Sequence, residues 1–413
     1  MNEAANEKWS IRHGIFNIMS LNLTNNYASF FAINVLGATN YQIGLLSSLP
    51  PLVSMIAMIP GAIWVNRLEE KKKFTTTSTL IARSFLLLVA FIPFLPNADL
   101  AIWFIAVIAL MNLPGSMGNL SWQSMMGDIF PENRRAIFFS KRGRILSIVS
   151  MIVTLLMGIV MVQFNKEWAL PYQFLFLLAF LIGMIEVYYL SKHREPKRVV
   201  DKIEKKHSIN LQVIKEKPYL AFLLCALFYH FSWQIAWATL TIYQIKYAEA
   251  TALWFSLFTV ANSIGQIISF GWWGKMSSKY GNPLMLVFAG LGMGMIPLLS
   301  LFSTNLYYLA FVQFLSGLSL SGLSILLFNH LLSVSNTEQR TSSIAIYNIL
   351  LSLIGFFAPQ LGVYILEEYN MTTTLVTATT LRIVAACSFL IIYFQFDKRK
   401  YFGKSVGAVK IKN

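Results

Sequence analysis

Long apolar stretches alternate with short polar gaps along the whole chain, and twelve such stretches can be distinguished. A helix of about 20 apolar residues crosses the hydrocarbon core of a bilayer. Because lipid offers no water to backbone donors and acceptors, stretches of this length can satisfy them only as helices. The predicted spans lie near residues 14–36, 42–66, 74–95, 100–127, 144–164, 171–191, 219–245, 252–274, 283–303, 307–333, 343–366 and 373–396. The pattern therefore predicts an all-α integral membrane protein with twelve transmembrane helices.

Positive charge follows the same alternation. Lys and Arg gather at the chain ends and in every second gap between spans, with dense runs at 192–217 and 398–412. The opposite half of the predicted protein carries only Lys166, Lys246 and Arg382. Cytoplasmic loops collect Lys and Arg. We therefore expect a multi-pass protein of the cell membrane with both termini in the cytoplasm.

Composition narrows the class of protein. Of the 413 residues, 56% are hydrophobic and 12% are charged, which does not suit a soluble surface. The formal net charge of +15 comes from cations scattered over short loops, which favours lipid headgroups as partners and argues against nucleic acid. The sequence has no cluster of His, Asp or Glu at catalytic or metal-ligand spacing. We expect no enzymatic activity, no cofactor, no metal site and a monomeric protein.

One long polar segment separates the spans into two sets of six. The predicted parts are an N-terminal half at 1–190, a cytoplasmic linker at 191–218, a C-terminal half at 219–397 and a basic cytoplasmic tail at 398–413. The linker carries a dense mixture of charges, as expected of a solvated segment. The fold class predicted is thus two six-helix halves.

The loops after the second and eighth spans repeat one pattern, in which a small residue is followed four positions later by a polar residue and then a cation. The residues are Ala62, Asn66 and Arg67 in the first copy and Gly274, Ser278 and Lys279, followed by Gly281, in the second. A second echo relates the loops after the fourth and tenth spans, through Arg134 and Arg340. In these loops and in its span number, the whole chain resembles the major facilitator superfamily.

The resemblance implies a cytoplasmic gate at the repeated loops. In the family, this turn closes the cytoplasmic face through hydrogen bonds and charge pairs to neighbouring helix ends. The resemblance makes Asp128 the carboxylate partner of Asn66 and Arg67, although Asn66 and Ser278 stand where the family has Asp. The implied gate residues are Asn66, Arg67, Asp128, Arg134, Gly274, Ser278, Lys279, Gly281 and Arg340. The alternative is that these residues only form tight turns and set topology.

Polar residues at helical spacing inside the spans are candidates for binding a solute. His230, Trp233, Gln234 and Trp237 form one stripe of the seventh span, at i, i+3, i+4 and i+7. A polar stripe is costly in lipid, so it should face the protein interior. Further candidates are Asn22, Asn26, Asn119, Trp122, Gln123, Asn262, Gln266 and Asn348. The alternative for each amide is a hydrogen bond between helices.

Charge inside the spans is scarce in the sequence. Glu186 is expected within reach of the cytoplasmic interface. Arg83, near mid-depth in the third span, is expected to extend toward the headgroups without a specific partner, and the alternative is that it anchors an anionic group of the solute. A cavity low in charge suits a neutral or amphipathic solute. His230 and Glu186 are the candidates for carrying a coupling proton.

These observations predict a secondary transporter that moves a small neutral or amphipathic solute by alternating access. Coupling to protons is included in the prediction, and export is placed slightly ahead of import. Two alternatives stay open: an importer or uniporter of a sugar-like or nucleoside-like solute, and a lipid translocator built on the same fold.

Overall fold

The computed structural model describes residues 3–66, 68–95, 99–130, 132–195, 211–335 and 340–397. Arg67, most of the predicted linker and the predicted tail at 398–413 therefore lie outside the described residues. The side chains of Asn66, Arg134 and Arg340 also lie outside them, so these members of the predicted gate stay predictions.

The described chain is helical, which confirms the all-α fold class. The main helices are α1 (Glu3–Phe30), α2 (Asn40–Asn66), α3 (Lys71–Phe91), α4 (Leu100–Ile129), α5 (Glu132–Met161), α6 (Ala169–Ser191), α7 (Lys217–Ile242), α8 (Ala252–Tyr280), α9 (Asn282–Gly294), α10 (Ile296–Leu301), α11 (Leu306–Val334), α12 (Arg340–Glu368) and α13 (Met371–Ile392). Since α9 and α10 together form one span, Asn282–Leu301, the helices make twelve long segments. Eleven of these segments, within the described residues, are long and apolar enough to cross a membrane.

The first helix differs from its prediction. It begins at Glu3, well before the predicted start at residue 14, and it is the long segment that lacks a sufficiently apolar window. The extra turns are polar but are held by the fold: the Asn6 side chain donates to the Arg194 carbonyl at 2.9 Å and accepts from the Arg194 N–H at 2.9 Å. A hydropathy pattern cannot detect a helix whose polar face is satisfied by other helices.

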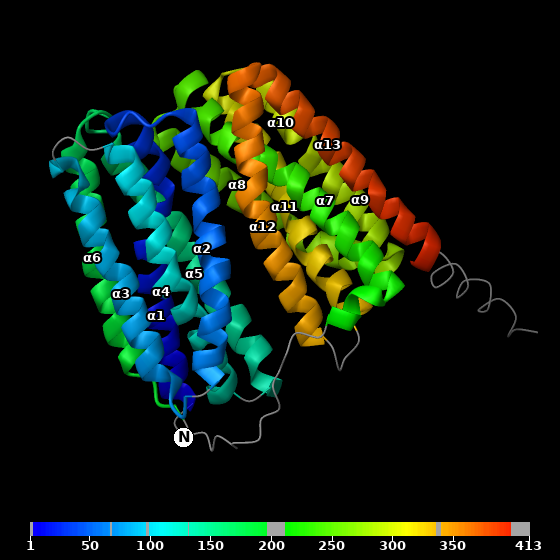
Figure 1. Ribbon diagram of the computed structural model, residues 1–413, viewed down its shortest axis with the longest axis horizontal. Coiled ribbons are helices and arrows are strands. Elements are labelled where there is room, and N and C mark those ends of the chain that lie inside the picture. The colour runs from blue at the N-terminus through cyan, green and yellow to red at the C-terminus, as the bar shows by residue number, and fades with distance from the viewer. Residues whose placement is uncertain are drawn as a thin grey trace, which may run out of the picture. The chain divides into compact units, whose positions relative to one another are not determined.

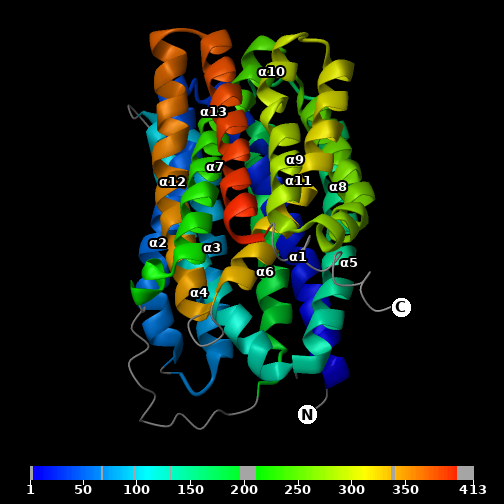
Figure 2. The same ribbon diagram turned by 90° about the vertical axis from the view of Figure 1, so that its right-hand side faces the viewer.

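Two compact units are formed by the helices. Unit 1 comprises Met1–Lys205 with Ala250–Ser256, and unit 2 comprises Lys206–Glu249 with Leu257–Asn413. In unit 1, α1 packs against α5 and α6, while α4 packs against α2 and α3. In unit 2, α7 packs against α12 and α13, and α9 packs against α11 and α13. Figures 1 and 2 show the helices of each unit running alongside one another.

The turn between α8 and α9 explains one residue of the repeated loop pattern. Gly281 has φ +89° and ψ 152°, a backbone conformation that side chains with a Cβ rarely adopt, and it caps the start of α9. Asn282 and Pro283 follow, and Pro is well tolerated in the first turn of a helix. The glycine is therefore required by the turn itself.

Candidate functional site

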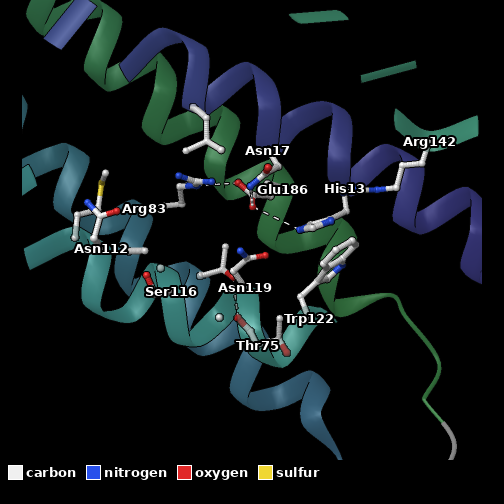
Figure 3. A pocket seen from close by; sticks show the side chains of 16 residues that line it. His13, Asn17, Thr75, Arg83, Asn112, Ser116, Asn119, Trp122, Arg142 and Glu186 are labelled. Atoms are coloured by element: carbon white, nitrogen blue, oxygen red, sulfur yellow. Dashed lines mark hydrogen bonds and ion pairs between the residues drawn. The ribbon is translucent and has the colours of Figure 1, made fainter. Parts of the chain in front are cut away.

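A polar cavity of about 330 Å³ lies inside unit 1, between the helices α1, α3, α4, α5 and α6. Its lining residues are His13, Asn17, Leu21, Thr75, Thr79, Ala82, Arg83, Met111, Asn112, Gly115, Ser116, Gly118, Asn119, Trp122, Arg142 and Glu186. Figure 3 shows α1 and α6 with the His13, Asn17 and Glu186 side chains on one side of it and α4 on the other.

A buried ion pair forms one wall of the cavity. The Nε of Arg83, on α3, donates to Oε2 of Glu186, on α6, at 2.8 Å, and the two residues are 5% and 1% exposed. The expected positions of both side chains are therefore wrong. Glu186 does not extend to the interface and Arg83 does not reach for headgroups, because each neutralises the other inside the helical unit, where an unpaired charge would be costly.

Two residues of α1 complete the environment of Glu186. Asn17 donates from Nδ2 to Oε1 of Glu186 at 2.8 Å, and Nε2 of His13 lies 3.5 Å from the same oxygen. Neither residue was among the predicted binding residues, because His13 precedes the predicted span at 14–36 and the predicted polar line of that span starts at Asn22. Their spacing of i and i+4 places them on one helix face, and this signal could have identified them.

The wall opposite is a single face of α4. Asn112, Ser116, Asn119 and Trp122 follow one another at intervals of four, three and three residues, so their side chains share one side of the helix. Asn119 and Trp122 were predicted as binding residues, and both line the cavity. The predicted residue Gln123 is exposed and does not line it.

Three polar side chains of the lining have groups without a hydrogen-bond partner in the described chain. Trp122 Nε1 and His13 Nδ1 are buried and have no hydrogen-bond partner among the described residues. The side chain of Asn119 is exposed to the cavity and also makes no hydrogen bond within the described part of the chain. An unsatisfied buried polar group costs about 1–3 kcal/mol, so such groups favour a ligand or water beside them.

The two predicted amides of α1 lie elsewhere. Asn22 donates to Oγ of Ser150 at 2.8 Å, and Asn26 donates to Oγ1 of Thr154 at 3.1 Å. Both partners belong to α5, so the amides connect two helices in the way that the alternative interpretation described. Neither residue lines the cavity.

Unit 2 holds the stripe of α7. His230 Nε2 lies 3.0 Å from the Tyr347 hydroxyl, and the His230 and Trp233 ring centroids are 5.6 Å apart. Trp233 in turn meets Trp237 edge-on at 6.0 Å, and Gln234 is half-buried on the same helix. Trp233 therefore contacts both His230 and Trp237, and the His230 ring is hydrogen-bonded to α12.

Arg382 lies beside this stripe, in the interior of α13. Its side chain is fully buried in unit 2. It donates to the carbonyls of Trp233 at 2.8 Å, Met293 at 3.2 Å and Ser232 at 3.4 Å. Arg382 thus ties α13 to the backbones of α7 and α9.

The remaining predicted residues of unit 2 are separate from the stripe. Asn262 donates to the Gln313 carbonyl at 3.2 Å and accepts from Gln266 at 2.8 Å, so these amides link α8 to α11. Asn348 is exposed on α12 and accepts at its backbone carbonyl from Ser352.

The described part of the predicted gate has its own contacts. Asp128 pairs with Lys71, whose side chain is buried, so the described partner of this carboxylate comes from the start of α3. Ser278 donates to the Gly274 carbonyl at 3.0 Å, and the Lys279 ammonium lies 5.0 Å from the Tyr280 ring. Within the described residues, no group of three or more His, Cys, Asp or Glu side chains is arranged to hold a metal.

Solved structures share this fold. A point mutant of the nucleoside transporter NupG has a TM-score of 0.73 and 10% sequence identity, over 93% of this chain and 100% of that one. The D-xylose-proton symporter has a TM-score of 0.72 and 11% identity, over 93% and 96%. A POT family transporter has a TM-score of 0.67 and 15% identity, over 96% of each chain. No curated protein matches the sequence.

The sequence itself matches the Major Facilitator Superfamily over residues 14–251 and again over residues 222–410. The two matches together cover nearly the whole chain and both sets of spans. Members of this family are secondary transporters of small molecules and not enzymes. This chain is therefore a multi-pass membrane protein that belongs to the Major Facilitator Superfamily of secondary transporters.

Proposed function

We propose that this transporter carries a small amphipathic solute in the cavity of unit 1, by alternating access, with a proton bound at Glu186. The observation that supports the proposal best is the Arg83–Glu186 pair, which places a neutralised carboxylate in the wall of a polar cavity. The proposal retains the cell membrane as the location and both termini in the cytoplasm, on the basis of the charge pattern.

The lining supports an amphipathic cargo. Asn119 offers an exposed amide and Trp122 a buried indole Nε1 that has no partner among the described residues, while Leu21 and Met111 contribute apolar surface. Ligand sites are typically largely apolar with a few polar groups that fix orientation. The cavity volume of about 330 Å³ suits a solute of modest size.

Glu186 is better placed than His230 to couple a proton to transport. It is the one carboxylate among the described lining residues, and its contacts reach α1 and α3 from α6. Adding a proton would remove the charge that holds Arg83 and would change the contacts of three helices at once. His230 is held by Tyr347 in unit 2 and does not line this cavity.

Export stays slightly ahead of import in this proposal. The solved neighbours include transporters of nucleosides and of xylose, but at 10–12% identity they support the fold alone.

Lipid translocation is the second candidate, and one feature favours it. An apolar groove of about 360 Å³ lies between α5 and α6, lined by residues such as Met161, Trp168 and Phe174.

Ligand-dependent thermal unfolding of the purified protein tests the site. The panel contains sugars, nucleosides, amphipathic drugs and lipids, and a ligand at 100 times its dissociation constant adds about 2.7 kcal/mol of stability. Asn119→Ala should weaken the stabilisation. Ser324→Ala is the matched control, because this exposed hydroxyl of α11 bonds only to its own helix. Equal stabilisation of both variants by every ligand would contradict the proposal, and stabilisation by lipids alone would support the translocator.

A further inference from the structure

Arg142 brings a second guanidinium to the cavity of unit 1. It extends from α5 toward α1, where its Nε donates to the Ser10 carbonyl at 3.3 Å, and its guanidinium lies 4.5 Å from the centre of the Trp122 ring. The group lies so close to Gly14 that a Cβ at that position would be 2.6–2.9 Å from it, and the guanidinium would have to shift. The sequence thus leaves room for a guanidinium that three elements of unit 1 hold in place.

The charge of Arg142 is not neutralised by a carboxylate. Among the described residues, Glu186 pairs with Arg83, Glu7 pairs with Lys141, and no acidic side chain forms an ion pair with Arg142. The described lining thus has two guanidiniums and one carboxylate, which leaves one positive charge in excess. Arg142 is half-buried, so its guanidinium is partly shielded from water and gains from an anion that reaches it inside the cavity.

Unpartnered ring nitrogens surround the same end of the cavity. Trp122 and His13 stack with centroids 5.9 Å apart, and each has a buried nitrogen without a hydrogen-bond partner among the described residues. His13 is 6% exposed. Figure 3 shows His13, Trp122 and Arg142 together at one end, with Asn112 at the other. Trp122 Nε1 can only donate, so it suits an acceptor. His13 Nε2 faces the Glu186 carboxylate, which only accepts, so His13 Nδ1 is an acceptor when the ring is neutral and a donor only when the ring is protonated.

We propose that the cargo carries a carboxylate, which docks against Arg142 and accepts a hydrogen bond from Trp122 Nε1. This inference rests on the proposed function, because it takes the unit 1 cavity as the cargo site. It specifies the polar end of the amphipathic solute as an anion. The remaining groups of α4, such as Asn119 and Ser116, would then contact the uncharged part of the solute.

The test compares carboxylates with their own primary amides. A water molecule takes about 30 Å³ of liquid volume, so the cavity has room for roughly ten heavy atoms. The probes are benzoate and benzamide, phenylacetate and phenylacetamide, and nicotinate and nicotinamide. We expect each carboxylate, but not its amide, to raise the unfolding temperature of the wild-type protein.

Variants assign the effect to Arg142. Arg142→Gln should weaken carboxylate binding at least ten-fold, as expected for a hydrogen bond to a charged group, and Arg142→Lys should restore part of it. Lys141→Gln is the matched control. Lys141 is next to Arg142 in the sequence, but its ammonium is exposed and pairs with Glu7. If Arg142→Gln is too unstable to purify, carboxylate stabilisation is compared between Arg142→Lys and the wild type, and weaker stabilisation of Arg142→Lys is the result expected.

The failure of this inference is distinguishable from failure of the cavity as the cargo site. Stabilisation by amides as strong as that by carboxylates, lost in Asn119→Ala, would overturn the anionic cargo and keep the site. Carboxylate stabilisation that is unchanged in both Arg142 variants would also overturn the inference. Ligand binding that is unaffected by Asn119→Ala and by the Arg142 variants would contradict the site itself.

Discussion

Arg83 and Glu186, 103 positions apart in sequence, form a buried ion pair in which Nε of Arg83 lies 2.8 Å from Oε2 of Glu186. The pair joins α3 to α6, and Asn17 of α1 donates to the other carboxylate oxygen. The two contacts of Glu186 therefore link three helices of unit 1 at the wall of the cavity.

The pair should behave as a unit in mutagenesis. Arg83→Gln and Glu186→Gln each leave one buried charge without its partner, which typically costs 3–5 kcal/mol. The double variant removes both charges and should be more stable than the sum of the two single losses predicts. Unfolding temperatures of the four proteins in one detergent measure the coupling. Strictly additive losses would show that the two side chains do not interact.

A second ion pair allows a comparison of buried and exposed charges. Asp128→Asn leaves the buried Lys71 ammonium without its carboxylate, whereas Glu7→Gln affects Lys141, whose side chain is 59% exposed. Surface pairs contribute about 0–1 kcal/mol, so the Asp128 variant should lose several times more stability. Thermal unfolding of both variants checks this order. Equal losses would mean that Lys71 reaches solvent when its partner is removed.

Protonation of His193, just after α6, should lower the stability of the protein in acid. Burial lowers the pKa of its imidazole to about 4, while His13 and Arg142 lie near enough to disfavour a positive charge further. Because the unfolded imidazole has a pKa near 6.5, the unfolded state binds more protons between pH 6.5 and 4. Stability is therefore complete above pH 6.5 and is lost as the pH falls toward 4, by roughly 3 kcal/mol.

The measurement is the unfolding temperature as a function of pH for the wild type and for His193→Gln. The variant keeps an amide that can donate to the Leu190 carbonyl, which lies 2.9 Å from His193 Nδ1. Its unfolding temperature should fall less between pH 6.5 and 4. An identical acid response in the two proteins would assign the loss to other groups.

At Arg382 in unit 2, we expect the lysine variant to be less stable than the methionine variant. Its guanidinium donates to three backbone carbonyls at once, among them those of Trp233 and Met293. Lysine keeps the buried charge but, as a point donor on a flexible stem, cannot reproduce the planar fork. Methionine removes the charge together with its desolvation cost. Arg382→Lys should therefore unfold at a lower temperature than Arg382→Met, and the reverse order would contradict this account.

The helices were predictable because each long span must satisfy its backbone internally, and length and apolarity reveal that requirement. Asn119 and Trp122 were found because they lie at helical spacing inside an apolar span. The Arg83–Glu186 pair could not be predicted from the sequence, since no periodicity relates residues on separate helices. His13 was not predicted because it lies in the polar start of α1, which is buried by the fold. A polar segment of low hydropathy is expected to be solvent-exposed, so the pattern gave no sign of this burial.

The predicted cytoplasmic gate likewise contains one feature that the sequence reveals and one that it does not. Gly281 was predicted from its motif, and its positive φ gives the physical reason. The pairing of Asp128 with Lys71 was not predictable from the loop pattern, because it depends on where the start of α3 lies against the end of α4.

Transport driven by a pH gradient tests the central claim most directly. The strongest stabilising ligand would be followed in proteoliposomes containing the wild type or Glu186→Gln, with and without an imposed gradient. Glutamine keeps an oxygen for Asn17 and Arg83 but cannot exchange a proton. We expect the wild type to accumulate the ligand against its concentration only with the gradient, and Glu186→Gln to equilibrate it without accumulation. Gradient-driven accumulation by Glu186→Gln at the wild-type level would contradict the claim that Glu186 carries the coupling proton.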